Sequence, residues 1–309
     1  YSEKADFSGS TYSEKADFSG STYSEKADFS GSTYSEKADF HGSTYQGEAS
    51  FGESTYEKKV IFSTSNSRST YKGKADFSGS TYRGDWINFS DSTYEKKVIF
   101  STSASRSTYE GPAYFGGSTY KGKAEFGEST YEKDATFSTS GFPSTYRGEV
   151  TFSGSTYKDE ANFSNSNYEK YVNALESTYW GEADFSDSIY RGDWIIFNSS
   201  TYQGKADFSG SIFYQKVYFG ADGDNSSFSH FTDCAPQFYD ETNHKNTLFG
   251  SPNNNFTVEN GRGYPIYRNL EGLPLGCKFL TSEQKEYLAD KFQEIEKINN
   301  KLREIKDPK

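Results

Sequence analysis

The sequence predicts an all-β solenoid that ends in an α-helix. Two observations lead to this fold class: an 11-residue repeat that fills about the first 212 residues, and an aromatic residue at every fifth or sixth position within it. A third observation is the change of composition towards the C-terminus, where the repeat fails and an amphipathic pattern begins. Self-similarity at a short fixed period is typical of chains that stack one structural unit on the next.

The repeat is nearly perfect at its start. The unit YSEKADFSGST occurs three times without a change in residues 1–33, and the next copy differs only at His41. Degenerate copies follow, which gives 18 units before residue 213. The 27 Phe and 26 Tyr fall largely in these units, and a disordered chain would avoid such residues.

The residue types within a unit favour strands over a helix. A period of 11 also suits a helical supercoil, but the recurring Ser, Thr and Gly are poor helix formers. The aromatic spacing alternates between five residues, from Phe7 to Tyr12, and six, from Tyr12 to Phe18. Residues two apart in a strand share a face, so Ala5 points the same way as Phe7. Each unit therefore predicts short strands and corners, with coils stacked about 4.8 Å apart.

Each 11-residue unit divides into two pentapeptides and one extra residue. Residues 16–20 read Ala-Asp-Phe-Ser-Gly, residues 21–25 read Ser-Thr-Tyr-Ser-Glu, and Lys26 follows. This pattern resembles the pentapeptide-repeat family, whose unit is a small residue, Asp or Asn, a central Leu or Phe, and two variable residues. The resemblance covers about residues 1–212 and implies a right-handed quadrilateral β-helix, here with about 22 residues per coil. It implies little about activity.

Tyrosine occupies half of the central positions. A buried phenol needs a hydrogen-bond partner, and the Ser two residues before each Tyr is one candidate. The alternative is that the Tyr sides are looser and their hydroxyls reach water. With two units per coil, the 18 units give about nine coils and a rod of roughly 43 Å.

Insertions of four residues test the number of units per coil. They lengthen the units that begin at Tyr56, Tyr94 and Tyr131, which lie three units apart, whereas the related unit at Tyr168 has none. With two units per coil the inserted loops must alternate between opposite corners, and with three they would form one ridge. We expect two units per coil.

Two units contain one extra residue and the tripeptide Arg-Gly-Asp. They begin at Tyr82 (YRGDWINF) and Tyr190 (YRGDWIIF), and the extra residue predicts a local bulge at a corner. The same slot reads KGK, QGE, RGE and WGE elsewhere. Ordinary variation of the repeat therefore produces this tripeptide, which weakens the case for cell adhesion through it.

The chain divides into a repeat solenoid (1–220), irregular last coils with a loop-rich cap (221–279) and an amphipathic helix (280–309). Thr281 and Gln284 suit a capping box at the start of the helix. We expect the helix to fold back over the open end of the solenoid; the alternative is pairing with another chain. The apolar stripe for such an association consists of Leu288, Phe292, Ile295, Ile298, Leu302 and Ile305.

Signals of catalysis are weak. His230, Asp233, Cys234 and His244 lie in one loop-rich stretch, but none of the familiar zinc spacings is present. The carboxylates recur with the repeat, as solvated corner residues do, rather than as an acid/base pair. We therefore expect no catalytic residue, no cofactor and no metal. Cys234 and Cys277 could pair or stay reduced.

Charge and composition limit the partners. The net charge of −11 and the lack of a basic stripe argue against nucleic-acid binding, and no stretch approaches the roughly 18 apolar residues of a membrane span. Some members of the family that the chain resembles mimic DNA and bind a topoisomerase such as gyrase, but Lys recurs on nearly every coil here. A lesser alternative is ice binding through stacked outward Thr residues, namely Thr11, Thr22, Thr33 and Thr44.

The sequence thus predicts a rigid, non-enzymatic rod that associates with itself, end to end or as a fibre. An open solenoid end presents unpaired strand edges that template association. An extracellular or cell-surface location is favoured over the cytoplasm. The interior ladders are expected to be Phe7, Phe18, Phe29, Phe40, Phe51, Phe77 and Phe126 on one pair of sides, and Tyr12, Tyr23, Tyr34, Tyr45, Tyr82 and Tyr120 on the other.

Overall fold

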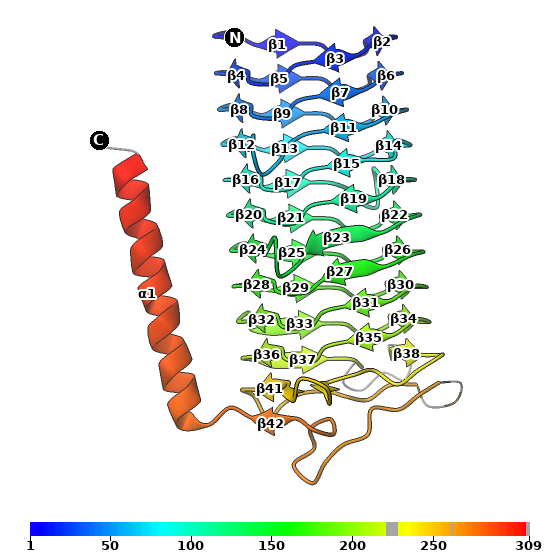
Figure 1. The fold of residues 1–309 in the computed structure, drawn as a ribbon, viewed down its shortest axis with the longest axis vertical. Helices are drawn as coiled ribbons and strands as arrows, with labels where there is room; N and C mark the ends of the chain where they lie inside the picture. The colour runs from blue at the N-terminus through cyan, green and yellow to red at the C-terminus, as the bar shows by residue number, and fades with distance from the viewer. Residues whose placement is uncertain (221–227, 260, 262, 307–309) are drawn as a thin grey trace.

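The chain winds into a solenoid of about nine coils, with about 23 residues per turn, followed by one α-helix (Figure 1). This computed structural model describes residues 1–220, 228–259, 261 and 263–306, except the side chains of 295, 296 and 299–306. Each coil contributes one short strand to each of four parallel sheets, which we call A, B, C and D in chain order. The predicted four-sided β-solenoid with a C-terminal helix is confirmed.

Sheets A and C form one pair of sides, and their strands are built around the Ala or Val that precedes each Phe. Sheet A consists of β1 (Ala5–Asp6), β5 (Ala27–Asp28), β9 (Ala49–Ser50), β13 (Ala75–Asp76), β17 (Val98–Ile99), β21 (Ala124–Glu125), β25 (Val150–Thr151), β29 (Val172–Asn173), β33 (Trp194–Ile196) and β37 (Lys216–Tyr218). Sheet C consists of β3 (Ala16–Asp17), β7 (Ala38–Asp39), β11 (Val60–Ile61), β15 (Ile87–Asn88), β19 (Ala113–Tyr114), β23 (Ala135–Ser138), β27 (Ala161–Phe163), β31 (Ala183–Asp184) and β35 (Ala206–Asp207).

Sheets B and D form the other pair, built mainly on the Thr-Tyr dipeptide. Sheet B consists of β2 (Thr11–Tyr12), β6 (Thr33–Tyr34), β10 (Thr55–Tyr56), β14 (Thr81–Tyr82), β18 (Thr108–Tyr109), β22 (Thr130–Tyr131), β26 (Thr156–Tyr157), β30 (Thr178–Tyr179), β34 (Thr201–Tyr202) and β38 (His230–Phe231). Sheet D consists of β4 (Thr22–Tyr23), β8 (Thr44–Tyr45), β12 (Thr70–Tyr71), β16 (Thr93–Tyr94), β20 (Thr119–Tyr120), β24 (Thr145–Tyr146), β28 (Asn167–Tyr168), β32 (Ile189–Tyr190), β36 (Ile212–Phe213), β41 (Leu248–Phe249) and β42 (Lys278–Phe279). A separate hairpin joins β39 (Tyr239–Asp240) to β40 (Lys245–Asn246).

The strand register shows that two repeat units make one coil. Ala5 pairs with Ala27 in sheet A, and Thr11 pairs with Thr33 in sheet B. Each residue of the first coils therefore stacks on the residue 22 positions later, which has the same identity. This excludes three units per coil.

The three inserted loops lie on opposite corners, as two units per coil require. The 63–69 loop and the 138–144 loop both follow strands of sheet C (β11 and β23) and lead into sheet D. The 101–107 loop follows β17 of sheet A and leads into sheet B. The alternation predicted from the sequence is therefore confirmed.

Aromatic rings fill the interior in four columns. Within a column the rings stack face to face, as Tyr34 and Tyr56 do at 4.9 Å between centroids and 1° between planes. Between columns the contact is edge to face: Phe29 of the sheet A column meets Phe40 of the sheet C column at 5.3 Å and 78°. Stacked and T-shaped pairs are the two favourable geometries for such rings. The predicted Phe and Tyr ladders are confirmed, with the Phe columns on sheets A and C.

Buried Ser residues connect successive coils through hydrogen bonds to the backbone. The Ser32 amide donates to Oγ of Ser54 in the next coil (3.2 Å), and Ser32 Oγ donates to the carbonyl of Phe7 (3.2 Å). This pattern recurs along the rod, so these hydroxyls bond to the backbone. The Ser two residues before a Tyr also interacts with the phenol, as the sequence suggested: Ser21 lowers the pKa of Tyr23, against the larger effect of burial.

Most phenol hydroxyls are buried and have no hydrogen bond of normal geometry among the described residues. The rings are enclosed, so the alternative of hydroxyls that reach water is wrong. Burial raises the pKa of the phenols, to about 12 for Tyr23. The residues are Tyr23, Tyr34, Tyr45, Tyr56, Tyr71, Tyr94, Tyr109, Tyr120, Tyr131, Tyr146, Tyr157, Tyr179, Tyr190 and Tyr202.

On the outer surface of the first coils, Lys and Asp side chains two residues apart form ion pairs. Lys4 and Asp6 are 3.0 Å apart, and Lys15 and Asp17 are 3.1 Å apart. Stacking identical coils places Asp above Asp, and like charges directly opposite one another are destabilising. The Lys of the same coil offsets that repulsion.

The helix α1 (Ser282–Lys306) runs beside the solenoid, back towards its N-terminal end (Figure 1). The predicted capping box is present: the Thr281 amide donates to Oε1 of Gln284, and the Gln284 amide donates to Oγ1 of Thr281. Phe292 is buried against Tyr214, at the corner between sheets D and A. The expectation that the helix covers the open end is therefore wrong, because its contacts are with a side of the rod.

Replacing Tyr109 with Phe should raise stability. The hydroxyl is buried without a hydrogen bond of normal geometry, so its removal relieves a desolvation cost of about 1–3 kcal/mol. Phe100→Ala should instead lower stability by about 3–5 kcal/mol, because it leaves a cavity in the sheet A column between Phe77 and Phe126. Urea unfolding of both variants measures the two changes. A loss of stability in Tyr109→Phe would show that the phenol has a partner such as a buried water.

The first coils should be sensitive to acid. Hydrogen bonds from Ser8 and Ser19 are the main reason that the pKa values of Asp6 and Asp17 fall from 3.8 to about 2. A lowered folded-state pKa stabilises the protein above the unfolded value, and this contribution is lost as the pH falls from about 4 towards 2. Amide hydrogen exchange, corrected for its intrinsic rate, should show residues 1–33 losing protection in this window. Unchanged protection down to pH 2 would contradict the assignment.

Candidate functional site

The outward-facing residues of sheet C change from charged to uncharged in the middle of the rod. They are, from the N-terminal end, Asp17, Asp39, Ile61, Asn88, Tyr114, Thr136, Asn162, Asp184 and Asp207. Asp17, Asp39 and Asp207 each pair with a Lys two positions earlier, for example Asp39 with Lys37 at 2.7 Å. The five positions from Ile61 to Asn162 carry no charge. The repeat is thus altered on five successive coils of a single face.

The two loops on this face follow the first and the fourth of these altered positions. The 63–69 loop follows β11 and the 138–144 loop follows β23, and the sheet order places them three coils apart, about 14 Å. Each loop closes on itself through a pair of backbone hydrogen bonds, Thr64 with Ser67 and Thr139 with Phe142. In both, the Thr Oγ1 also accepts from the amide three residues later. Each loop therefore has a defined conformation and forms a wall on this face.

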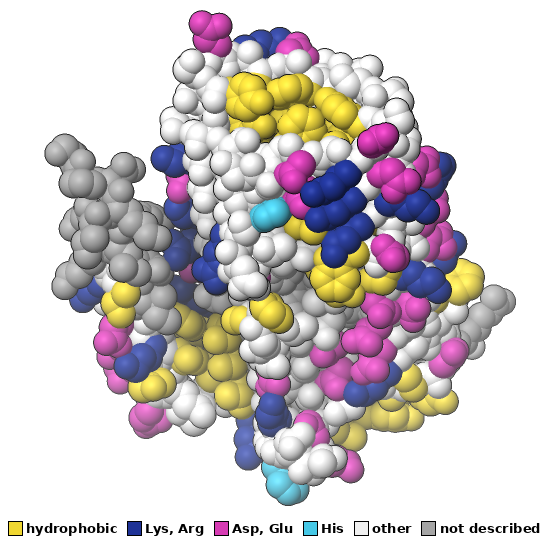
Figure 2. Space-filling view, turned by 45° about the horizontal axis from the view of Figure 1, so that its top comes forward, with side chains coloured by type: hydrophobic (Ala, Val, Ile, Leu, Met, Phe, Trp, Pro, Cys, Tyr) yellow, Lys and Arg dark blue, Asp and Glu magenta, His cyan; other side chains and the backbone are white. Residues whose placement is uncertain are grey.

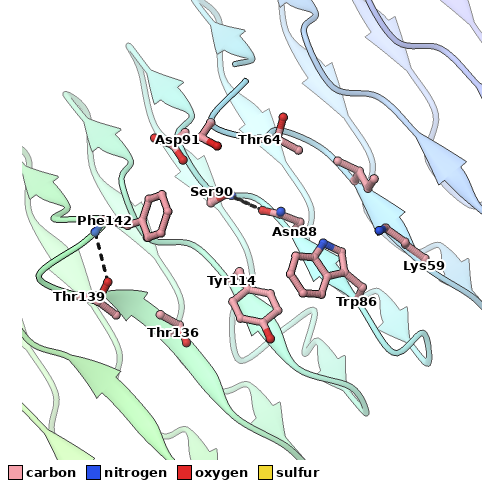
Figure 3. Close-up of a pocket in the computed structure, with 13 residues that line it drawn as sticks. Lys59, Thr64, Trp86, Asn88, Ser90, Asp91, Tyr114, Thr136, Thr139 and Phe142 are labelled. Atoms are coloured by element: carbon pink, nitrogen blue, oxygen red, sulfur yellow. Dashed lines mark hydrogen bonds between the residues drawn. The ribbon is translucent and has the colours of Figure 1, made fainter. Parts of the chain in front are cut away.

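Between these walls lies a groove of about 590 Å³ (Figure 3). Its floor is the outer surface of sheet C, from Ile61 to Thr136, and its ends are formed by Thr64 and Phe142. This volume is within the range of pockets that hold small organic ligands. We call it the sheet C groove.

An aromatic pair forms the centre of the floor. Trp86 and Tyr114, on neighbouring coils, lie 4.6 Å apart between ring centroids, with 34° between their planes. Lys59, whose usual Asp partner is replaced by Ile61, lies over the Trp86 ring, 5.1 Å from its centroid. Trp86 remains 38% exposed, and Phe142 at the far wall is 50% exposed. Large aromatic surface is thus left open to a ligand.

The side of the groove towards sheet D is formed by two coil corners. One is Ser90–Asp91, and the next is Gly116–Gly117, where two consecutive glycines leave no side chain. Gly117 has a φ of +73°, and a Cβ there would lie 2.8 Å from Oδ1 of Asp91. The glycine therefore makes room for the carboxylate.

Asp91 is a buried carboxylate that is only partly paired. Its side chain is 7% exposed, and Oδ1 lies 3.4 Å from Arg68 of the 63–69 loop. Oδ2 accepts no hydrogen bond from any described residue. Burial raises the pKa of this carboxyl, and Arg68 only partly offsets the effect. At the equivalent repeat position three units later, on the opposite corner between sheets A and B, Glu128 is paired with Arg106 at 2.9 Å and is more exposed.

The sequence-predicted ice-binding residues do not form one array. Thr11 and Thr33 stack in sheet B, whereas Thr22 and Thr44 stack in sheet D on the opposite side. Each sheet therefore carries a single outward Thr column.

Both Arg-Gly-Asp tripeptides have an Arg that is engaged within the molecule. Arg83 pairs with Glu57 of the preceding coil at 2.6 Å and with Glu110 of the next at 3.5 Å. Arg191 lies over the Phe292 ring of α1, at 3.8 Å. Neither Arg is therefore presented as the free end of a recognition loop.

The suspected metal cluster is not assembled. Among the described residues, no group of three or more His, Cys, Asp or Glu side chains is placed to hold a metal ion. His244 instead contacts the Tyr239 hydroxyl at 3.0 Å. Cys234 and Cys277 are both free thiols, and burial raises the pKa of Cys277 to about 12.

The structure describes the side chains of three residues of the apolar stripe of α1. Phe292 is buried against the solenoid, Leu288 is half-buried and Ile298 is exposed. The side chains of Ile295, Leu302 and Ile305 lie outside the described residues. No helix in the described part of the chain has the length and apolar character needed to cross a membrane.

Comparison with known proteins gives no match: no family model, curated protein or solved structure is significantly similar to this chain. The resemblance to pentapeptide repeats therefore rests on the repeat pattern and on the parallel stacking of the coils.

Sequence reasoning missed the groove, although its signals are present in the repeat. The units around it depart from the consensus at the outward positions, with Trp86, Tyr114 and the Gly116–Gly117 corner. Their proximity becomes evident only when two units per coil place the alternate loops on the same corner.

Replacing Asp91 with Asn should raise the melting temperature at pH 7. The folded-state pKa of Asp91 is raised, so the folded state is favoured below the usual carboxyl pKa and loses that advantage as the pH rises. The gain should therefore vanish at about pH 3. The control is Glu128→Gln, whose effect should stay within about 0.5 kcal/mol. A lower melting temperature for Asp91→Asn at pH 7 would show that the Arg68 pair outweighs burial.

Proposed function

We propose that the protein is a non-enzymatic structural rod whose coils associate with coils of other copies, end to end. The observation that carries this proposal is the self-complementarity of the repeat. In the first coils each residue pairs with a residue of the same kind, Ala5 with Ala27 and Asp6 with Asp28. The upper face of one such coil therefore fits the lower face of another, whether both belong to one chain or to two.

The electrostatics of the first coils support stacking of this kind. Each outward Asp has its own Lys partner within the coil, at 3.0 Å for Asp6 and 2.9 Å for Asp28. A coil therefore carries its compensating charge with it and requires no special partner. The acidic residues are paired in the same way on later coils, for example Asp76 with Lys74. This pairing gives less support to the DNA-mimic alternative, which needs unpaired negative charge.

The first coil presents an apolar surface along the rod axis. Figure 2 shows hydrophobic side chains gathered at this end of the molecule. Tyr1 is exposed, and Phe7, Tyr12 and Phe18 are only partly buried, whereas the same columns are fully buried from the second coil on. Stacking another coil here would bury these rings and satisfy the strand edges of β1 to β3.

Phe7→Glu should abolish linear association. The purified chain should form concentration-dependent linear particles in electron microscopy and sedimentation, since each contact buries one coil face. A charge at residue 7 cannot be buried there without a partner. Ser13→Glu is the matched control, because residue 13 is exposed on the outside of the rod, and it should leave association unchanged.

Monodisperse single rods at every concentration would contradict self-association. Equal association of the Phe7→Glu and Ser13→Glu variants would contradict the end-to-end geometry.

A further inference from the structure

We infer that the sheet C groove is a carbohydrate-binding site that takes a neutral pyranose ring of a glycan. The groove is built by departures from the repeat that coincide in space: two walls, an exposed aromatic pair and a partly paired buried carboxylate. None of these is needed to stack the coils, because the rest of sheet C stacks without them.

The floor offers what the apolar face of a sugar requires. Trp86 and Tyr114 form a broad aromatic surface on two successive coils, with 34° between their ring planes (Figure 3). Phe142 adds a third ring at the wall, half exposed. A pyranose carries a patch of C–H groups on its ring face, and aromatic side chains supply the matching flat apolar contact.

The edge of the groove offers partners for hydroxyl groups. Asp91 Oδ2 is a buried acceptor with no donor among the described residues. Asn88 is buried and its Oδ1 accepts from both the amide and the hydroxyl of Ser90, at 2.8 and 2.6 Å, so its amide nitrogen points away from Ser90 (Figure 3). A carboxylate acceptor and an amide donor that line one groove are a combination that sugar hydroxyls, which both donate and accept, can satisfy.

The charges around the groove argue against ionic ligands. A cationic ligand would meet Lys59, which already lies over the Trp86 face at 5.1 Å, and Arg68, which already faces Asp91. A phosphate or another anion would meet the buried carboxylate of Asp91. A neutral polyhydroxylated ring avoids both conflicts.

A second exposed aromatic pair in the same molecule serves as a comparison for the pair in the sheet C groove. Trp194 and Tyr218 form a similar exposed pair on sheet A, 5.7 Å apart with 27° between their planes. They arise from the second Arg-Gly-Asp-Trp unit but lie far from the inserted loops in sequence and have no counterpart of Asp91 beside them among the described ion pairs. If aromatic exposure alone sufficed for binding, the two pairs would behave alike.

The test is to titrate the full chain with cellotetraose, chitotetraose and mannotetraose. Calorimetry and tryptophan fluorescence measure the binding. At least one should bind saturably, with a dissociation constant of about 1 mM or tighter. Trp86→Ala and Asp91→Ala should each weaken that binding at least tenfold, roughly the effect of one lost stacking or charged hydrogen-bond contact. Trp194→Ala should leave it within about twofold, since the two sites are distant.

A second variant guards against misfolding. Phe142 is exposed at the tip of a loop, so Phe142→Ala should keep the wild-type melting temperature while weakening binding. Absence of saturable binding by all three oligosaccharides would overturn the inference. So would equal losses in Trp86→Ala and Trp194→Ala, or tighter binding of a trimethylammonium probe such as choline than of any sugar.

Discussion

The parallel backbone ladder is the constraint on which the rest of the structure depends. Every coil hydrogen-bonds to the next in register, so each side chain has the side chain one turn later directly above it, about 5 Å away. Any residue type used at an inward position must therefore be able to stack on itself. Flat aromatic rings do this well, which explains a core of Phe and Tyr with almost no Leu and no Met.

The same ladder restricts polar and charged residues. Buried Ser is tolerated because its hydroxyl and the amide of a Ser one coil away complete a chain of hydrogen bonds, as for Ser32 and Ser54. Outward Asp is tolerated because a Lys within the coil offsets it. The phenol hydroxyls are the exception, because most of them are buried without a hydrogen bond of normal geometry among the described residues. The chain replaces Tyr by Phe at the ends of these columns, in Phe213, Phe231 and Phe249.

The fold could be predicted from the sequence because, in a repeat, the residue that stacks on a given residue lies a fixed number of positions later. Once the period and the aromatic spacing are known, the positions of Phe7 and Tyr12 determine those of Phe29 and Tyr34. The capping box of α1 was equally local. The position of α1 could not be predicted, because it depends on contacts of Phe292 with residues far away in the sequence. The groove was missed for a related reason: each of its parts looks like tolerated variation until the coils bring them together.

The inserted loops recur every three units, whereas a coil contains two. A loop therefore returns to the same corner only after six units, which is the smallest common multiple of three and two. Six units make three coils. Adding three units therefore places the next loop half a turn further on, at the opposite corner. Loops spaced in this way alternate between two corners of the rod, and the two loops that border the sheet C groove are six units apart.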